Sequence, residues 1–158
     1  METRLIYNAT ERLYEVRLGI RVLSSYGTKE EALIAQLSGE APAAMEIAQK
    51  LIKSYPDLQG RAIKAVALLA QGAVEATEHP NLFNVRSQEK PGSRPKEVYL
   101  VDVNASTCTC LDWERNAPLL NGRKVCKHIL AALYLRRVGI RPSGISVRTE
   151  RLCHEKRP

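Results

Sequence analysis

The sequence predicts an α+β protein, in which an N-terminal α-helical region precedes a small zinc-stapled module made of a β-hairpin and a helix. Three observations predict this class. Apolar residues recur at helical spacing through the first 80 residues, two β-branched segments follow, and a group of Cys and His residues precedes a last apolar segment. We therefore expect a helical region over 1–80, a zinc module over 81–139 and a basic tail over 140–158.

Four helices are expected in the helical region, the first, third and fourth from apolar residues at helical spacing and the second from the capping pair that precedes it. They cover about 13–23, 29–38, 44–55 and 57–77. Asn8 with Glu11, and Thr28 with Glu31, have the spacing of capping boxes for the first two helices. Pro42 suits the first turn of the third.

The zinc module is expected to contain a hairpin and one helix. Segments 82–87 and 98–103 are rich in β-branched and apolar residues and predict two strands joined by a long, polar, turn-rich loop. Segment 127–138 is apolar over most of its circumference, carries two arginines in its last turn and stops at Gly139, which predicts a helix buried at its start. We expect no regular structure in the tail, 140–158.

Two pairs of candidate metal ligands lie fifteen residues apart, Cys108 with Cys110 and Cys126 with His128. Zinc takes four such ligands in a tetrahedron. Because side chains alternate in an extended chain, Cys-x-Cys places both thiols on one side. The second pair comes at the start of a helix, where unpaired N–H groups and the helix dipole favour thiolate. The residues therefore predict one structural zinc ion per chain, which would join the hairpin to the helix.

The pattern Cys-x-Cys, a variable loop and Cys-x-His resembles the SWIM-type zinc finger. The resemblance extends over about 83–135 and includes the hairpin segments 83–87 and 99–102 and the helix start at 126–132. It implies that the zinc ligands are Cys108, Cys110, Cys126 and His128. Family members often have proline after the second cysteine, where this chain has Leu111. The family is associated with DNA binding and protein–protein interaction in transposases, chromatin-remodelling and recombination proteins and small mobile-element proteins, so the resemblance is more specific for the metal than for the partner.

The net charge of +7 is uneven, with −1 over residues 1–80 and +8 over residues 81–158. A basic half favours an anionic partner, and nucleic acid, most of all DNA, is the leading candidate. The alternative is that the charge only confers solubility. The candidate nucleic-acid-binding residues are Arg123, Lys124, Lys127, Arg136, Arg137 and Arg141. They would bind phosphates with strong salt dependence, in a DNA transaction such as recombination, transposition or regulation.

Two other interpretations stay open. The third and fourth helices with the hairpin loosely resemble a winged helix-turn-helix, in which the fourth helix would read the groove and the hairpin would be the wing. The alternative is that the fourth helix only packs against the hairpin and does not read DNA. The second interpretation is a protein–protein adaptor, in which the helical region docks a partner helix or another copy and the zinc is purely structural.

The sequence predicts no enzyme and no small-molecule substrate. It has no glycine-rich phosphate loop, no nucleophile elbow and no paired carboxylates with a nearby histidine. We expect Trp113 to fill the core rather than stack on bases, and Cys153 with His154 to be a free thiol and a solvated histidine.

The protein is expected to lie in the cytoplasm or the nucleoid. No membrane partner is expected. The longest apolar run, 129–135, is far shorter than the roughly 20 residues of a spanning helix. The first residues are charged and lead into no signal-peptide core. In such a compartment, four cysteines are better suited to metal binding than to disulfides.

Overall fold

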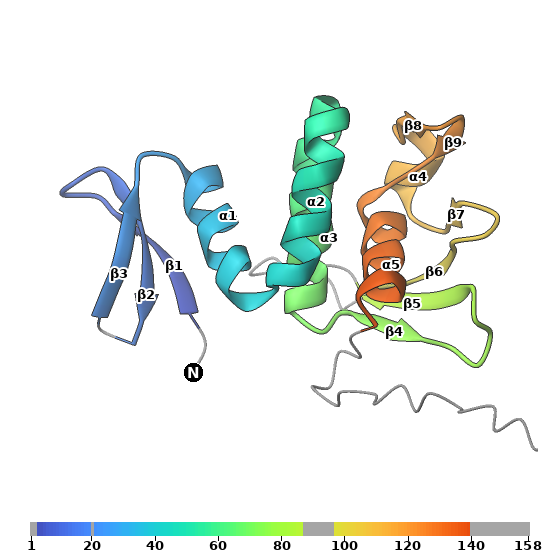
Figure 1. Cartoon of the computed structure of the whole chain (residues 1–158), viewed down its shortest axis with the longest axis horizontal. Coiled ribbons are helices and arrows are strands. Elements are labelled where there is room, and N and C mark those ends of the chain that lie inside the picture. Colours follow the sequence, from blue (N-terminus) through green and yellow to red (C-terminus); the bar gives the residue numbers. More distant parts are fainter. Residues whose placement is uncertain (1–2, 20, 87–96, 140–158) are drawn as a thin grey trace, which may run out of the picture.

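The computed structural model describes residues 3–19, 21–86 and 97–139, and it confirms the α+β class (Figure 1). Strands β1–β3 and helix α1 lie at one end of the molecule, α2 and α3 in the middle, and the Cys- and His-bearing part at the other end. The elements are β1 (Thr3–Asn8), β2 (Leu13–Leu18), β3 (Arg21–Tyr26), α1 (Lys29–Glu40), α2 (Pro42–Ser54), the 3-10 helix η1 (Pro56–Leu58), α3 (Gln59–Ala70), β4 (Val74–Ala76), β5 (Leu82–Arg86), β6 (Val98–Asp102), β7 (Thr107–Cys108), α4 (Leu111–Arg115), β8 (Leu119–Leu120), β9 (Arg123–Lys124) and α5 (Lys127–Val138).

The helix predicted over 13–23 is wrong, because this part of the chain forms an antiparallel sheet of order β1-β2-β3. Leu5 pairs with Val16, which pairs with Ser24 on the next strand, so these side chains share one face of the sheet. All three strands contact α1. Strand formers such as valine, isoleucine and tyrosine are frequent in residues 3–26, and this preference outweighs the helical spacing of a few apolar residues.

Asn8 closes the turn between β1 and β2 instead of capping a helix. Its Oδ1 accepts hydrogen bonds from the backbone N–H groups of Thr10 and Glu11, at 3.1 and 3.2 Å. Its Nδ2 donates to Glu15 Oε1 at 2.6 Å, and Arg17 Nε donates to Glu15 Oε2 at 2.6 Å. These two hydrogen bonds lower the pKa of Glu15, so this buried carboxylate is charged and satisfied.

Helix α1 begins at the capping box predicted from the sequence. The Thr28 hydroxyl accepts a hydrogen bond from the Glu31 N–H, and Glu31 Oε2 accepts one from the Thr28 N–H, both at 3.2 Å. Pro42 occupies the first turn of α2, as expected. The second and third predicted helices are therefore confirmed.

Helix α3 ends at Ala70, so the predicted continuation of the helix to residue 77 is wrong. Gly72 has a φ of +62°, and the N–H of Ala73 donates to the Leu68 carbonyl at 2.9 Å, which terminates the helix. The helix is buried on most of its circumference and contacts both α2 and α5. It is therefore a core helix, and the structure does not support a groove-reading role for it.

The predicted hairpin is confirmed as β5 and β6, the central strands of a sheet of order β4-β5-β6-β7. Phe83 pairs with Val101, and Val85 pairs with Tyr99. Helix α5 covers residues 127–138 as predicted and is terminated by Gly139, whose φ is +69°. The loop at 87–96 and the tail at 140–158 lie outside the described residues.

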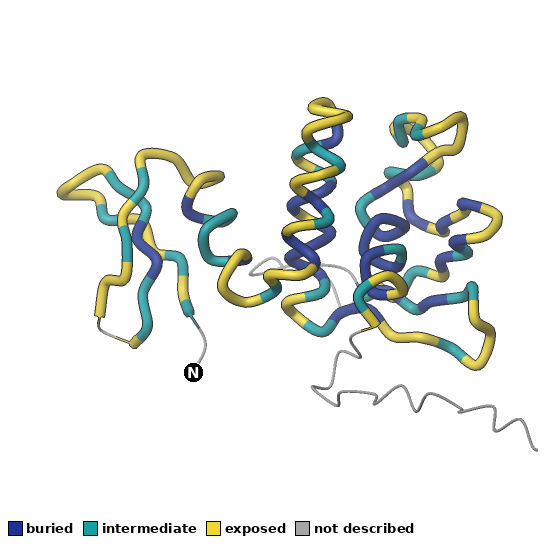
Figure 2. The backbone as a smooth tube through the Cα atoms, viewed as in Figure 1, coloured by how far each residue is buried: buried dark blue, intermediate teal, exposed yellow. Residues whose placement is uncertain are grey.

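One buried cluster extends from the end of α1 through α2 and α3 to the β4–β7 sheet and α5 (Figure 2). The largest fully buried side chains are Met45, Leu68, Ile129, Leu130, Val66, Val74, Val85, Val101 and Cys126. The helices before residue 80 and the metal-binding part after it therefore share a core.

Replacing Leu68 with Ala should lower the free energy of unfolding by about 3 kcal/mol, because it leaves a cavity in this shared core. Leu119→Ala is the control and should change it by less than about 0.5 kcal/mol, since Leu119 is 65% exposed. Urea unfolding of the zinc-loaded protein can be followed by circular dichroism and by the fluorescence of Trp113, the single tryptophan. If Leu68→Ala lowers the urea midpoint measured by circular dichroism but not the midpoint measured by Trp113 fluorescence, the shared core is contradicted.

Candidate metal centre

Each of the four predicted ligands lies at the end of a strand or the start of a helix. Cys108 is the last residue of β7, and Cys110 is the N-cap of α4, where its sulfur accepts a hydrogen bond from the Trp113 N–H at 3.3 Å. Cys126 is the N-cap of α5, and His128 lies in the first turn of that helix. The second pair is therefore at the mouth of a helix, as predicted, where the dipole favours thiolate.

The four side chains converge on one point in the protein interior. One ligand atom from each lies within 4.8 Å of all the others, and all four residues are buried. The Nδ1 atom of His128 is 3.8 Å from Cys108 Sγ and 3.9 Å from Cys126 Sγ. Zn–S and Zn–N bonds of about 2.3 and 2.0 Å in a tetrahedron require separations of about 3.5–3.8 Å between ligand atoms. The donor set and its spacing therefore fit a single structural zinc ion.

Without a cation, three sulfurs at this spacing cannot all carry charge. Hydrogen bonds from the thiols of Cys108 and Cys126 lower the pKa of Cys110 far below its usual value. The hydrogen bond to Cys110, then that to Cys126, and then burial raise the pKa of Cys108. The three sulfurs therefore do not ionise independently, and a divalent cation favours the thiolate form of all three.

The His128 ring is positioned by an aromatic neighbour. The ring of Tyr99 lies against it, with centroids 4.6 Å apart and planes inclined at 39°. The Tyr99 hydroxyl donates to Glu97 Oε2 at 2.6 Å, and this hydrogen bond, with burial, raises the pKa of Tyr99 to about 12. Within the described residues, His128 Nε2 is buried without a hydrogen-bond partner. Ring packing, rather than a carboxylate or carbonyl, therefore holds the imidazole with Nδ1 toward the sulfurs.

Trp113 supports the loop between the ligand pairs. Its Nε1 donates to the Ser106 carbonyl at 2.9 Å, and the Ser106 hydroxyl donates to the Lys124 carbonyl at 2.7 Å. The Lys124 ammonium lies 5.3 Å from the centre of the Trp113 ring. Trp113 also packs against the buried cluster, which agrees with the core role expected for it.

Two contacts tie the metal-bearing part to the central helices. Arg61 of α3 forms a bidentate pair with Asp112 of α4, at 3.2 and 2.8 Å, and also donates to the Asn116 carbonyl. The Tyr55 hydroxyl hydrogen-bonds to Asn121 Oδ1 at 3.0 Å. Sequence reasoning gave no role to Arg61. It also gave no role to Tyr99 beside the metal site. Strand alternation places Tyr99 on the same face of β6 as Val101, and Val101 pairs with Cys108.

The candidate nucleic-acid-binding residues fall into two groups. Arg123 and Lys124 are exposed on β9, and Lys127 is half-buried at the start of α5. Arg136 and Arg137 are exposed at the other end of this helix, whose twelve residues span about 18 Å. Within the described residues, these candidates therefore do not form a single patch.

Three predicted residues are outside the described part of the chain. They are Arg141, Cys153 and His154.

A hairpin and a helix joined through a buried Cys3His site define a structural zinc-binding module. Comparison with known protein families agrees with this assignment, since residues 98–136 match the SWIM zinc finger. This segment begins with β6 and ends in the last turn of α5, so it contains all four ligands. No curated protein and no solved structure matched the chain. Among the described helices, none has the length and apolar character needed to cross a membrane.

Protein purified without added metal should contain about one zinc per chain, and Cys110→Ser should greatly weaken binding because the site loses one of its three thiolates. Cys153→Ser is the matched control and should retain the metal. Elemental analysis measures both. A zinc content near two in the wild type, or loss of zinc in the Cys153 variant, would contradict the four-ligand assignment.

Tyr99→Ala should weaken zinc binding by roughly tenfold or more, because the His128 ring loses the packing that orients it. Tyr99→Phe should bind zinc like the wild type, since the ring rather than the hydroxyl contacts His128. Competition with a chromophoric chelator measures both affinities. Equal weakening by the two variants would assign the effect to the Glu97 hydrogen bond instead.

Proposed function

We propose that this protein binds nucleic acid, with DNA the first candidate, through exposed cations that the zinc site holds in place. The supporting observation is a group at the tip of the zinc module. We call Arg115, Arg123 and Lys124 the metal-end cations. All three are exposed, and they lie on α4 and β9, between the two ligand pairs.

Two of the metal-end cations contact backbone carbonyls of the zinc module. Arg123 Nη1 donates to the Asn104 carbonyl at 3.0 Å, and Lys124 Nζ approaches the Glu114 carbonyl, next to Arg115, at 3.4 Å. Of the two acids on the same short helix, Asp112 is paired with Arg61 and Glu114 is exposed, so three cations face one exposed carboxylate there. The tip therefore presents positive charge on a supported backbone, which suits phosphate groups.

The rest of the positive charge lies largely outside the described residues. Of the +8 carried by residues 81–158, +2 belongs to 87–96 and +3 to 140–158. Binding through phosphates needs no inserted helix, so the burial of α3 is compatible with the proposal. Little sequence preference is expected, because phosphate contacts carry no base information.

The proposal includes no catalytic step and no substrate. Four protein ligands complete the coordination sphere of zinc and leave no position for an activated water. We propose the cytoplasm or nucleoid as the location, as expected for a protein that handles DNA.

Arg123→Ala combined with Lys124→Ala should weaken binding to duplex DNA and flatten the plot of log affinity against log salt by up to about two units, since each phosphate contact contributes about 0.9. The matched control is Arg136→Ala with Arg137→Ala, which removes the same charge and should change the slope much less. Fluorescence anisotropy across a salt series, on samples with equal zinc content, measures both.

Equal flattening by the two double variants would reduce the effect to net charge and contradict a site at the metal end. Wild-type protein that fails to bind duplex DNA, single-stranded DNA and RNA at low salt would refute the proposed function.

A further inference from the structure

A groove runs between α2 and α5, and none of the metal-end cations is part of its lining. Its volume is about 820 Å³, and it reaches Leu120 of β8, the strand partner of Arg123. On α2 it is lined by residues 43, 46, 47, 50 and 51, and on α5 mainly by 130, 133, 134 and 137. Both sets follow i, i+3, i+4, i+7 spacing, so each wall is one continuous stripe of a helix.

The walls are apolar and incompletely covered. Ile47, Leu51 and Leu133 are each partly buried and pack against the core with one side. The stripe on α2 covers eight residues of rise, about 12 Å, or two helical turns. Two parallel walls of this kind can accept a third helix, which would remove their remaining apolar surface from water.

The rim of the groove is basic. Lys50, Arg136 and Arg137 border it, and Glu46 is the one acidic residue of its lining. Glu46 is already paired with Lys50, at 2.7 Å. Two net positive charges therefore face whatever occupies the groove, which favours an occupant with acidic residues beside an apolar stripe.

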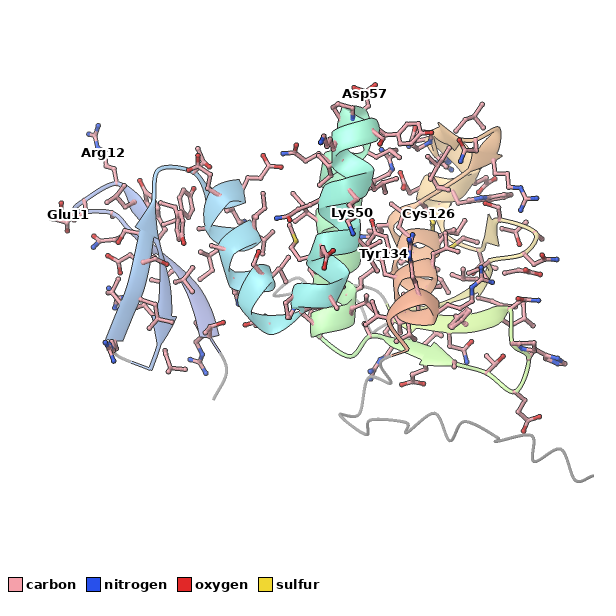
Figure 3. The ribbon with its side chains drawn as sticks, viewed as in Figure 1. Glu11, Arg12, Lys50, Asp57, Cys126 and Tyr134 are labelled. Carbon is pink, nitrogen blue, oxygen red and sulfur yellow. The ribbon has the colours of Figure 1, made fainter. Side chains whose placement is uncertain are left out.

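A buried tyrosine also lines the groove. Tyr134 is 3% exposed, and within the described residues its hydroxyl has no hydrogen-bond partner. Figure 3 shows Tyr134 of α5 and Lys50 of α2 close together in the region where the two helices meet. This hydroxyl has almost no exposed surface, so it lies beneath the groove, and the attraction of an occupant rests on the apolar walls and the basic rim.

We infer that the α2–α5 groove docks an acidic amphipathic helix of a partner protein. The helix would place apolar residues at i, i+3, i+4 and i+7 between the two walls and carboxylates against Lys50, Arg136 and Arg137. This inference does not rest on nucleic-acid binding, because none of the metal-end cations lines the groove.

The test uses the zinc-loaded full chain and a labelled helix-forming peptide of about 14 residues, with Leu at i, i+3, i+4 and i+7 and Glu at the flanking positions. Fluorescence anisotropy should show saturable, salt-sensitive binding. A second peptide with Lys in place of Glu should bind at least about tenfold more weakly, because it repels the rim.

Two variants locate the site. Arg136→Ala with Arg137→Ala should weaken the acidic peptide about five- to tenfold, whereas Arg123→Ala with Lys124→Ala should change binding less than about twofold. Ile47→Lys should weaken it more than about tenfold, since the peptide would bury an unpaired charge. Leu111→Lys adds the same charge at a side chain that is 62% exposed elsewhere, and it should bind like the wild type.

Three results would overturn the inference. The first is no binding of the acidic peptide by wild-type protein whose zinc content and dichroism are normal. The second is equal weakening by the two arginine and lysine double variants, which would indicate attraction by net charge alone. The third is a dimer in sedimentation equilibrium that Ile47→Lys dissociates, which would make a second copy the occupant.

Discussion

The fold depends on the position of helix α5, which meets two requirements at once. Its N-cap and first turn supply two of the four metal ligands, and the helix packs against α3 inside the shared core. A short hairpin and a two-residue ribbon bury too little surface to fix such a helix alone. Zinc adds binding free energy of about 10–16 kcal/mol in zinc-finger peptides, and in these systems that is folding free energy. Packing against α3 in the shared core also stabilises the position of α5.

This arrangement links the metal to surfaces that it does not touch. The metal-end cations lie on the loop between the ligand pairs, and one wall of the groove is α5 itself. The pair between Arg61 and Asp112 connects the loop to α3 as well. Because it is bidentate and only partly exposed, this pair fixes orientation more firmly than a single surface contact would. Loss of zinc is therefore expected to disturb the loop and the groove together, although no metal ligand lies in the loop or lines the groove.

Sequence reasoning succeeded where residue chemistry leaves few alternatives. Four ligands in two tight pairs permit little besides a metal site, and the turn-rich loop before Val98 and the stop at Gly139 define the hairpin and α5. It failed over residues 3–26, because Leu13, Val16 and Leu23 fit a helical stripe while the pairing of three strands is a long-range property. The early end of α3 has a local cause in Gly72. The role of Tyr99 depends on register across β6 and β7, which no single segment encodes.

The positive charge of the second half is divided by the geometry of one helix. Arg136 and Arg137 occupy the last turn of α5, where positive charge interacts favourably with the helix dipole, and α2 lies beside them. Arg123 and Lys124 come before its first turn, near a site whose three thiolates and one zinc carry a net charge of −1. Each pair thus lies near negative charge or a negative dipole end of its own, and about 18 Å of helix separates them. In the two proposals the same residue types would meet phosphates at one end and carboxylates at the other, because Arg136 and Arg137 line the apolar groove whereas Arg123 and Lys124 do not.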